Sequence, residues 1–217
     1  MAFTLYSMWR ATAPYRVRIG LNLKGVAYDY VGIDLVGGEA RRDPYTSLNR
    51  QGLLPALVTG DGVLTQSLAI LEWLEETHPE SPLLPASPRQ RATVRAMAEI
   101  IACDVHPLNN LRILQQLASL GFKFGGEEQT AWIHGWIGAG FDALEPMIAE
   151  HGGGFAFGGA PTIADCCLIP QLYSAERYGF DLAPYPAIRA VAERAAGHPA
   201  FIAALPDNQP DAVKPPA

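Results

Sequence analysis

The sequence predicts an α/β domain at residues 1–84 followed by an all-helical domain at residues 89–217. Stretches rich in aromatic and β-branched residues alternate with helical repeats of apolar residues up to about residue 76. Residues 78–88 then hold four prolines and cannot continue a helix, which predicts a linker. From Arg89 onward the apolar residues recur at helical spacing. The strands therefore belong to the first part of the chain.

Composition and charge narrow the possible partners. The 217 residues are 49% hydrophobic and 18% charged, as in an ordinary soluble globular protein. The net charge of −6 argues against nucleic acid, because phosphate binding needs a basic surface. No apolar run is long enough to cross a membrane, so we expect no membrane partner. Any anionic ligand must then be bound by a few local arginines.

The three cysteines, Cys103, Cys166 and Cys167, show no metal-binding or redox spacing. A disulfide between the adjacent pair is strained. We therefore expect all three to be reduced, and the cytoplasm to be the compartment.

The chain begins with a predicted strand and helix. Residues 3–6 are aromatic and β-branched, which favours a strand. Thr12 is the predicted N-cap of the next helix, Pro14 lies in its first turn, and Gly25 ends it. Residues 28–34 alternate in polarity and predict a second strand. These elements form a right-handed βαβ unit with parallel strands.

The loop before this helix is a candidate anion site. Free N–H groups and the helix dipole favour an anion at a helix start, and Arg10 adds a positive charge in the loop. Arg16 and Arg18 fall away from the apolar positions Val17 and Leu21, so we expect both arginines on a solvated face.

Residues 37–48 predict one short helix, after which Pro55 stands at the entry of an apolar strand. Residues 59–62 predict a tight turn into a returning antiparallel strand at residues 63–65.

A helix follows the hairpin and runs to Glu76. Ser67 either caps it or directs its hydroxyl and N–H at a bound carboxylate. This order of elements is that of a thioredoxin-like domain.

The second half predicts helices interrupted at His106-Pro107. Thr162 and Asp165 form a capping-box pattern, in which Asp165 has a structural role. The tail from residue 207 carries three prolines and is expected to be loose. The predicted helices cover residues 91–103, 108–120, 127–150, 162–178 and 186–196.

Several motifs resemble the cytosolic glutathione transferases, and in detail their zeta class. They are Trp9-Arg10, Arg16-Val17-Arg18-Ile19, Gln66-Ser67-Leu68-Ala69-Ile70, His106-Pro107-Leu108-Asn109-Asn110 and Ala175-Glu176-Arg177-Tyr178. The resemblance covers nearly all the chain except the tail. It implies a thioredoxin-like domain plus an all-α domain, the cytosolic glutathione transferase fold, glutathione as cofactor, and a homodimer.

The resemblance also assigns roles to residues of this chain. Thr12 and the backbone of Ala13 hold the glutathione thiolate, while Arg10 and Arg177 bind substrate carboxylates. A helix start with a hydroxyl suits a thiolate because its free N–H groups, its dipole and the hydroxyl all stabilise negative charge. Leu54, before a cis Pro55, pairs through its backbone with the cysteinyl unit. The other implied binding residues are Gln51, Gln66, Ser67, His106, Asn109 and Asn110.

One motif departs from the class. The class usually places Ser-Ser-Cys, or a variant that keeps a hydroxyl, where this chain has Ala11-Thr12-Ala13. The usual first serine matches Ala11, so Thr12 alone keeps a side-chain donor there. Leu53 likewise stands where some members carry glutamine.

The function that this resemblance implies is glutathione-dependent cis–trans isomerisation of a maleyl keto acid, maleylpyruvate or maleylacetoacetate, in aromatic catabolism. One alternative is a transferase or dehalogenase that acts on small electrophiles. A second is a glutathione-binding protein without catalysis, which the alanines at 11 and 13 allow.

Overall fold

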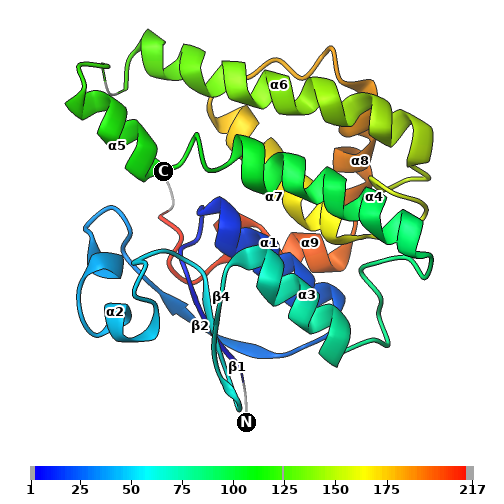
Figure 1. The fold of residues 1–217 in the computed structure, drawn as a ribbon, viewed down its shortest axis with the longest axis horizontal. Coiled ribbons are helices and arrows are strands. Elements are labelled where there is room, and N and C mark those ends of the chain that lie inside the picture. The colour runs from blue at the N-terminus through cyan, green and yellow to red at the C-terminus, as the bar shows by residue number, and fades with distance from the viewer. Residues whose placement is uncertain (1–2, 124, 214–217) are drawn as a thin grey trace. The chain divides into compact units, whose positions relative to one another are not determined.

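A four-stranded sheet forms the centre of the first unit of the computed structural model, which describes residues 3–123 and 125–213 (Figure 1). The strands are β1 (Phe3–Ser7), β2 (Tyr28–Gly32), β3 (Ala56–Thr59) and β4 (Gly62–Thr65), in the order β2-β1-β3-β4. β1 and β2 are parallel, whereas β3 runs antiparallel to both β1 and β4. The predicted βαβ unit and hairpin are confirmed.

Helices α1 (Thr12–Leu23) and α3 (Ser67–Thr77) pack together against this sheet. A Cβ on Gly20 would overlap the side chain of Leu71, so the glycine is what lets the two helices approach closely. The buried side chains of this core come from α1, α3, β1 and β3, namely Leu5, Val17, Leu21, Leu57, Ile70 and Leu74. A second buried cluster consists of Ile33, Ala40, Tyr45 and Ala56. Ala56 precedes Leu57 in β3, so the two residues point to opposite faces of the sheet.

The single helix predicted at residues 37–48 is two short ones. They are η1 (Glu39–Arg41), a 3₁₀ turn, and α2 (Tyr45–Leu48). Pro44 lies between them and is the N-cap of α2. A proline disfavours helical backbone in the residue before it, which separates the two turns.

The predicted cap at Thr12 and two predicted exposures are wrong, and of the two roles left open for Ser67 the structure excludes the cap. Ala11 is the N-cap of α1 and Gln66 the N-cap of α3, so Thr12 and Ser67 occupy the first helical positions. Arg16 and Arg18 are 2% and 0% exposed. Helix α1 has no solvated face at these positions, because α3 covers it on one side and the C-terminal helix α9 (Pro199–Ala204) on another.

The second unit, Leu84–Ala195, is helical. Its helices follow the predicted spans to within a few residues. Helix α4 (Pro88–Glu99) continues into a π-helical turn that ends just before His106, and α5 (Leu111–Ser119) starts after an Asn110 cap. The capping box of Thr162 and Asp165 is confirmed. The elements are α4 (Pro88–Glu99), η2 (Ile100–Val105), α5 (Leu111–Ser119), α6 (Glu127–His151), α7 (Ile163–Arg177) and α8 (Pro186–Ala196).

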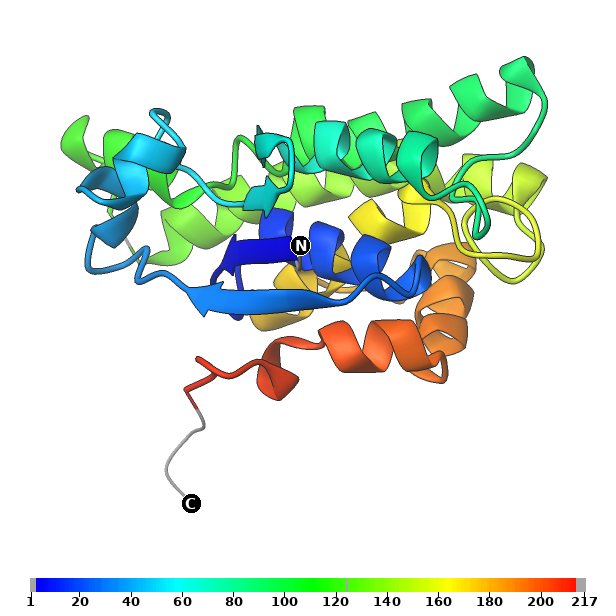
Figure 2. The same ribbon diagram turned by 90° about the horizontal axis from the view of Figure 1, so that it is seen from below.

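The C-terminal segment groups with the first unit from Ala196 onward, and not with the helical unit to which the sequence assigned residues 89–217. Helix α9 (Pro199–Ala204) lies beside α1, and the 3₁₀ turn η3 (Pro206–Asn208) follows it (Figures 1 and 2). The Asn22 amide of α1 donates to the Ala200 carbonyl at 3.0 Å. Gln209 and Asp211 are held by hydrogen bonds to Ala203, Leu205 and Trp9, so the expectation of a loose tail is wrong for this part of it. Residues 214–217 lie outside the described residues.

Candidate active site

Three chain segments meet at one end of the sheet. Tyr6, near the end of β1, pairs with Ala56 at the start of β3, and Ala56 pairs with Thr65 at the end of β4. The β1–α1 loop, the Leu54-Pro55 turn and the start of α3 therefore emerge side by side. The register of the sheet thus places the segments that carry Thr12, Leu54 and Ser67 next to one another.

The start of α1 offers an anion two backbone donors and one hydroxyl. Pro14 has no N–H, and the Tyr15 N–H donates to the Ala11 carbonyl at 3.1 Å. The N–H groups of Thr12 and Ala13 are those left without an intrahelical acceptor. Thr12 is half-buried and does not cap the helix, so its hydroxyl stays available beside them. This arrangement stabilises negative charge at the helix start.

The start of α3 is joined to α1 by a buried hydrogen bond. Arg16 Nη1 donates to Ser67 Oγ at 3.3 Å, and Ser67 is 6% exposed. Gln66, just before it, has φ of 68°, which among the described residues makes it the sole non-glycine residue in the left-handed region. Such backbone strain costs of order 1–3 kcal/mol and is typical of functional sites. The Gln66 amide donates to Gln51 Oε1 at 2.8 Å, so the start of α3 is also joined to the segment that leads into the Leu54-Pro55 turn.

The turn before β3 is fixed by two residues that the sequence reasoning missed. Tyr45 Oη and Asn49 Nδ2 both donate to the Leu53 carbonyl, at 2.6 and 2.7 Å. Burial raises the pKa of Tyr45 to about 12, so the phenol is a donor at neutral pH. The Leu54–Pro55 bond is cis, as expected. A signal for Asn49 was present, because Asn followed by a glycine-containing turn favours the Asx-type bond that Gln51 N–H makes to Asn49 Oδ1.

Arg10 is exposed, and its guanidinium lies 5.3 Å from the centre of the Trp9 ring. No ion pair among the described residues uses it. Stacking on an indole orients a guanidinium and leaves its N–H groups for an incoming carboxylate.

The second unit carries the remaining predicted residues. Asn110 Oδ1 accepts from Arg112 N–H at 3.1 Å and caps α5, which gives Asn110 a structural role. Both amide atoms of Asn109 are buried and have no hydrogen-bond partner among the described residues. A buried amide of this kind is a candidate for bonding a ligand. His106 is half-buried directly after the π-helical turn.

Arg177 ends α7 and is exposed. Its guanidinium lies 4.8 Å from the Tyr178 ring centre and donates to Tyr178 Oη at 3.1 Å. The described hydrogen bonds of this side chain include none to the helix carbonyls, so Arg177 is not a carbonyl cap.

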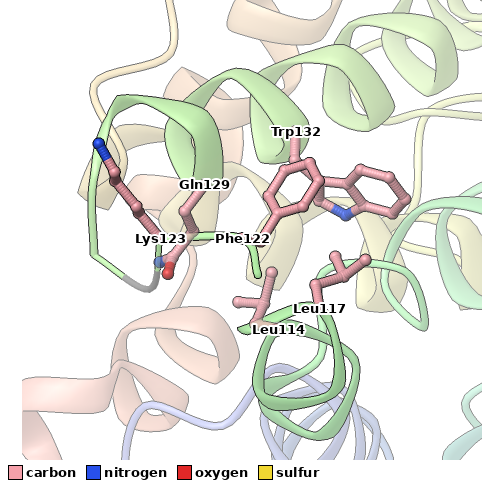
Figure 3. A pocket seen from close by; sticks show the side chains of 6 residues that line it. All are labelled: Leu114, Leu117, Phe122, Lys123, Gln129 and Trp132. Carbon is pink, nitrogen blue, oxygen red and sulfur yellow. The ribbon is translucent and has the colours of Figure 1, made fainter. Parts of the chain in front are cut away.

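A small hollow in the second unit is not this site. Leu114, Leu117, Phe122, Gln129 and Trp132 line it, and the Lys123 ammonium points away (Figure 3). Its volume of about 10 Å³ has room for one water molecule and excludes a tripeptide.

Within residues 3–123 and 125–213, no three His, Cys, Asp or Glu side chains gather as metal ligands. Over the same residues no helix combines the length and apolar character that a membrane span requires.

Comparison with known proteins identifies the family. Residues 6–82 match the glutathione S-transferase N-terminal domain, and residues 130–194 match the glutathione S-transferase C-terminal domain. A maleylpyruvate isomerase from Ralstonia sp is 49% identical over 213 residues, which cover 96% of this chain and 99% of that protein.

Solved structures agree in fold. A bacterial zeta-class maleylpyruvate isomerase, solved in its holo form, superposes with a TM-score of 0.92 at 48% identity, over 97% of this chain and 100% of that one. A maleylacetoacetate isomerase from Anaeromyxobacter dehalogenans with bound glutathione gives 0.88 at 43% identity, over 98% of both chains. That protein was also solved with bound dicarboxyethyl glutathione and citrate. The two matched domains and the identity along almost the whole chain place this protein in the zeta class of the glutathione S-transferase family.

Proposed function

We propose that this protein is a glutathione-dependent cis–trans isomerase of a maleyl keto acid, either maleylpyruvate or maleylacetoacetate. The observation that carries the proposal is the meeting of two helix starts at one end of the sheet, where a hydrogen bond from Arg16 joins α1, which begins at Thr12, to Ser67 at the start of α3. The family relatives named as isomerases of these acids support the same substrate class.

The residues present fit glutathione as the cofactor. Glutathione is a narrow, anionic peptide, and the N–H groups at the two helix starts match its two kinds of negative charge. Ser67 and Gln66 bind the γ-glutamyl carboxylate at the start of α3. The backbone of Leu54 pairs with the cysteinyl unit as a short strand does, and Gln51 supports Gln66 through their hydrogen bond. Thr12 and the N–H of Ala13 hold the sulfur.

When bound, glutathione would supply a nucleophilic thiolate that adds reversibly to the conjugated cis double bond, allows rotation about the resulting single bond and is then expelled to leave the trans isomer. The work of this chain is to keep that sulfur ionised and the substrate aligned. Arg10, whose guanidinium lies over the Trp9 ring, binds a substrate carboxylate, and Arg177, whose guanidinium lies over the Tyr178 ring, binds another. Asn109 donates from its buried amide to a ligand oxygen, and His106 lines the same region of the chain.

Because Ala11 has no hydroxyl, Thr12 is the residue whose side chain binds the sulfur. Because α1 starts at Thr12, its side chain lies in the first turn, next to the free N–H groups. The hydroxyl and the two N–H groups together replace the serine that the class usually carries one residue earlier.

Loss of the cis-enone absorbance, followed with each maleyl acid, tests the proposal. We expect turnover with glutathione, and none with S-methylglutathione, which retains the peptide and lacks the thiol. Absence of turnover with both acids would contradict the proposal. Conjugation of a small α-halo acid in that case would favour a transferase or dehalogenase. Calorimetric binding without any turnover would favour a non-catalytic glutathione-binding protein.

We also propose that the protein works as a homodimer in the cytoplasm. The family resemblance supports the dimer, and three cysteines without metal-binding or redox spacing fit a reducing compartment. Light scattering at micromolar concentration should give the mass of two chains, and the mass of one chain would contradict the dimer.

A further inference from the structure

Both backbone polar groups of Trp9, the residue before Arg10, are hydrogen-bonded, one to the C-terminal segment and one to Arg18. The Trp9 N–H donates to Asp211 Oδ2 at 3.1 Å. The Trp9 carbonyl accepts from Arg18 Nη2 at 2.7 Å. The same Arg18 donates through Nε and Nη2 to the Ala204 carbonyl, at 3.2 Å in each case. One polar group of Trp9 therefore contacts the tail directly, and the other contacts an arginine that binds the tail.

Asp211 is itself fixed by its surroundings. Its Oδ1 accepts from Tyr30 Oη at 2.6 Å. A Cβ built on Gly32 would lie 3.1 Å from the Asp211 Cβ, so the glycine provides the space that the aspartate fills. Gln209 ties the preceding turn by donating to the Ala203 and Leu205 carbonyls, at 3.0 and 2.8 Å. Figure 2 shows this C-terminal segment, in red, beneath the strand β2 that carries Tyr30.

These contacts act on Arg10 through the main chain. Arg10 is exposed, and its guanidinium lies over the Trp9 ring. The position of the Arg10 guanidinium therefore depends on where the Trp9 backbone and the Trp9 ring lie. A hydrogen bond from a peptide N–H to a carboxylate is about twice as strong as a neutral one, so Asp211 is the firmest of the constraints on the amide side of Trp9.

We propose that Asp211 is a positioning residue for Arg10: its carboxylate anchors the Trp9 amide and so aligns the Arg10 guanidinium for the substrate carboxylate. This inference rests on the proposed function for the role of Arg10. The tail of the chain is thereby part of the working site, although it lies 202 residues from Trp9 in sequence.

Kinetics of Asp211→Ala test the proposal against Asp207→Ala, which removes the same charge from an exposed position in η3. Asp211→Ala should raise KM for the maleyl acid about tenfold, leave glutathione affinity within about twofold, and leave conjugation of a neutral electrophile unchanged. Asp211→Asn keeps an acceptor of the same size and should show a smaller rise. Asp207→Ala should change nothing. Equal losses on both kinds of substrate, or no change in KM, would overturn the proposal.

A double-mutant cycle of Asp211→Ala with Arg10→Ala measures the energetic coupling between these two residues. If Asp211 acts through Arg10, adding Asp211→Ala to Arg10→Ala should have almost no further effect. Additive losses would mean that Asp211 acts by another route and would overturn the inference. If Arg10→Ala alone leaves KM unchanged, the proposed role of Arg10 fails, and the positioning role fails with it.

Hydrogen exchange gives a readout that does not depend on activity. The Trp9 amide should exchange at least about tenfold faster in Asp211→Ala, whereas the core amides of α1 and β1 keep their protection. Unchanged exchange at Trp9 would show that Asp211 does not hold this amide, and would overturn the proposal even while the isomerase activity stands.

Discussion

Arg16 Nη1 donates to Ser67 Oγ at 3.3 Å and so joins the second turn of α1 to the first residue of α3. Both side chains are buried, at 2% and 6% exposure. The bond fixes the distance between the two helix starts that the proposed function assigns to one glutathione molecule. A charged donor also makes the Ser67 hydroxyl a better donor toward a carboxylate.

Ser67→Ala should weaken glutathione binding by about tenfold, because the bond to the γ-glutamyl carboxylate is lost while the N–H groups of α3 remain. Calorimetry measures the change. Thr77→Ala, at the other end of the same helix, is the matched control and should bind as the unmodified protein does. Equal affinity in Ser67→Ala would remove Ser67 from the proposed site.

Thr12→Ala should lower kcat by about 10²-fold and leave the melting temperature almost unchanged, because the hydroxyl stabilises the thiolate and does not cap α1. Ultraviolet titration of bound glutathione should show a higher thiol pKa in the variant. Adding Ala11→Ser to Thr12→Ala should restore part of the rate by returning a hydroxyl to the adjacent position. An unchanged rate in Thr12→Ala would leave the N–H groups of α1 as the sole stabilisers.

Arg177→Ala should raise KM for the dianionic maleyl acid by about tenfold, with little effect on a neutral electrophile. Arg189→Ala removes the same charge from an exposed site on α8 and should leave both substrates unaffected. If Arg177→Ala instead reduces both reactions alike, its contact with Tyr178 is structural.

Asp165 should make the fold more stable as the solution becomes mildly acidic. Burial raises its pKa from the ordinary 3.8 to about 6, against the opposing hydrogen bonds from Ala156 and Thr162. The folded state then takes up the proton first, and stability rises as pH falls through 6, levelling off below about 4. The gain is at most roughly 3 kcal/mol in unfolding free energy.

Urea unfolding of the protein and of Asp165→Asn between pH 7 and pH 4 measures this effect, because the asparagine does not titrate. The difference in stability should move in favour of the aspartate as pH falls. A difference that moves the other way would mean that the hydrogen bonds to the carboxylate outweigh its burial.

Much of the fold follows from local sequence patterns. The period of the apolar residues predicts the strands and most helices, and Pro55, Gly25 and the Thr162 capping box mark their ends. The short helices around Pro44 and in the C-terminal segment were misjudged or missed, because a helix of one or two turns has too few residues to show a period. Their stability comes from contacts such as that of Asn22 with Ala200.

The sequence by itself determined which chemical groups this protein has: a helix start with Thr12 in place of a serine, Gln66-Ser67 before a second helix, and an arginine after Trp9. Only the tertiary structure decided how they are used. The sequence predicts Arg16 and Arg18 to be surface charges, because the spacing of apolar residues indicates which residues share a helix face and not what covers that face. Packing of α3 and α9 on α1 buries both arginines, and their donors then find Ser67, Trp9 and Ala204. Asp211 contacts Trp9 for the same reason, because the sheet and the tail bring them together.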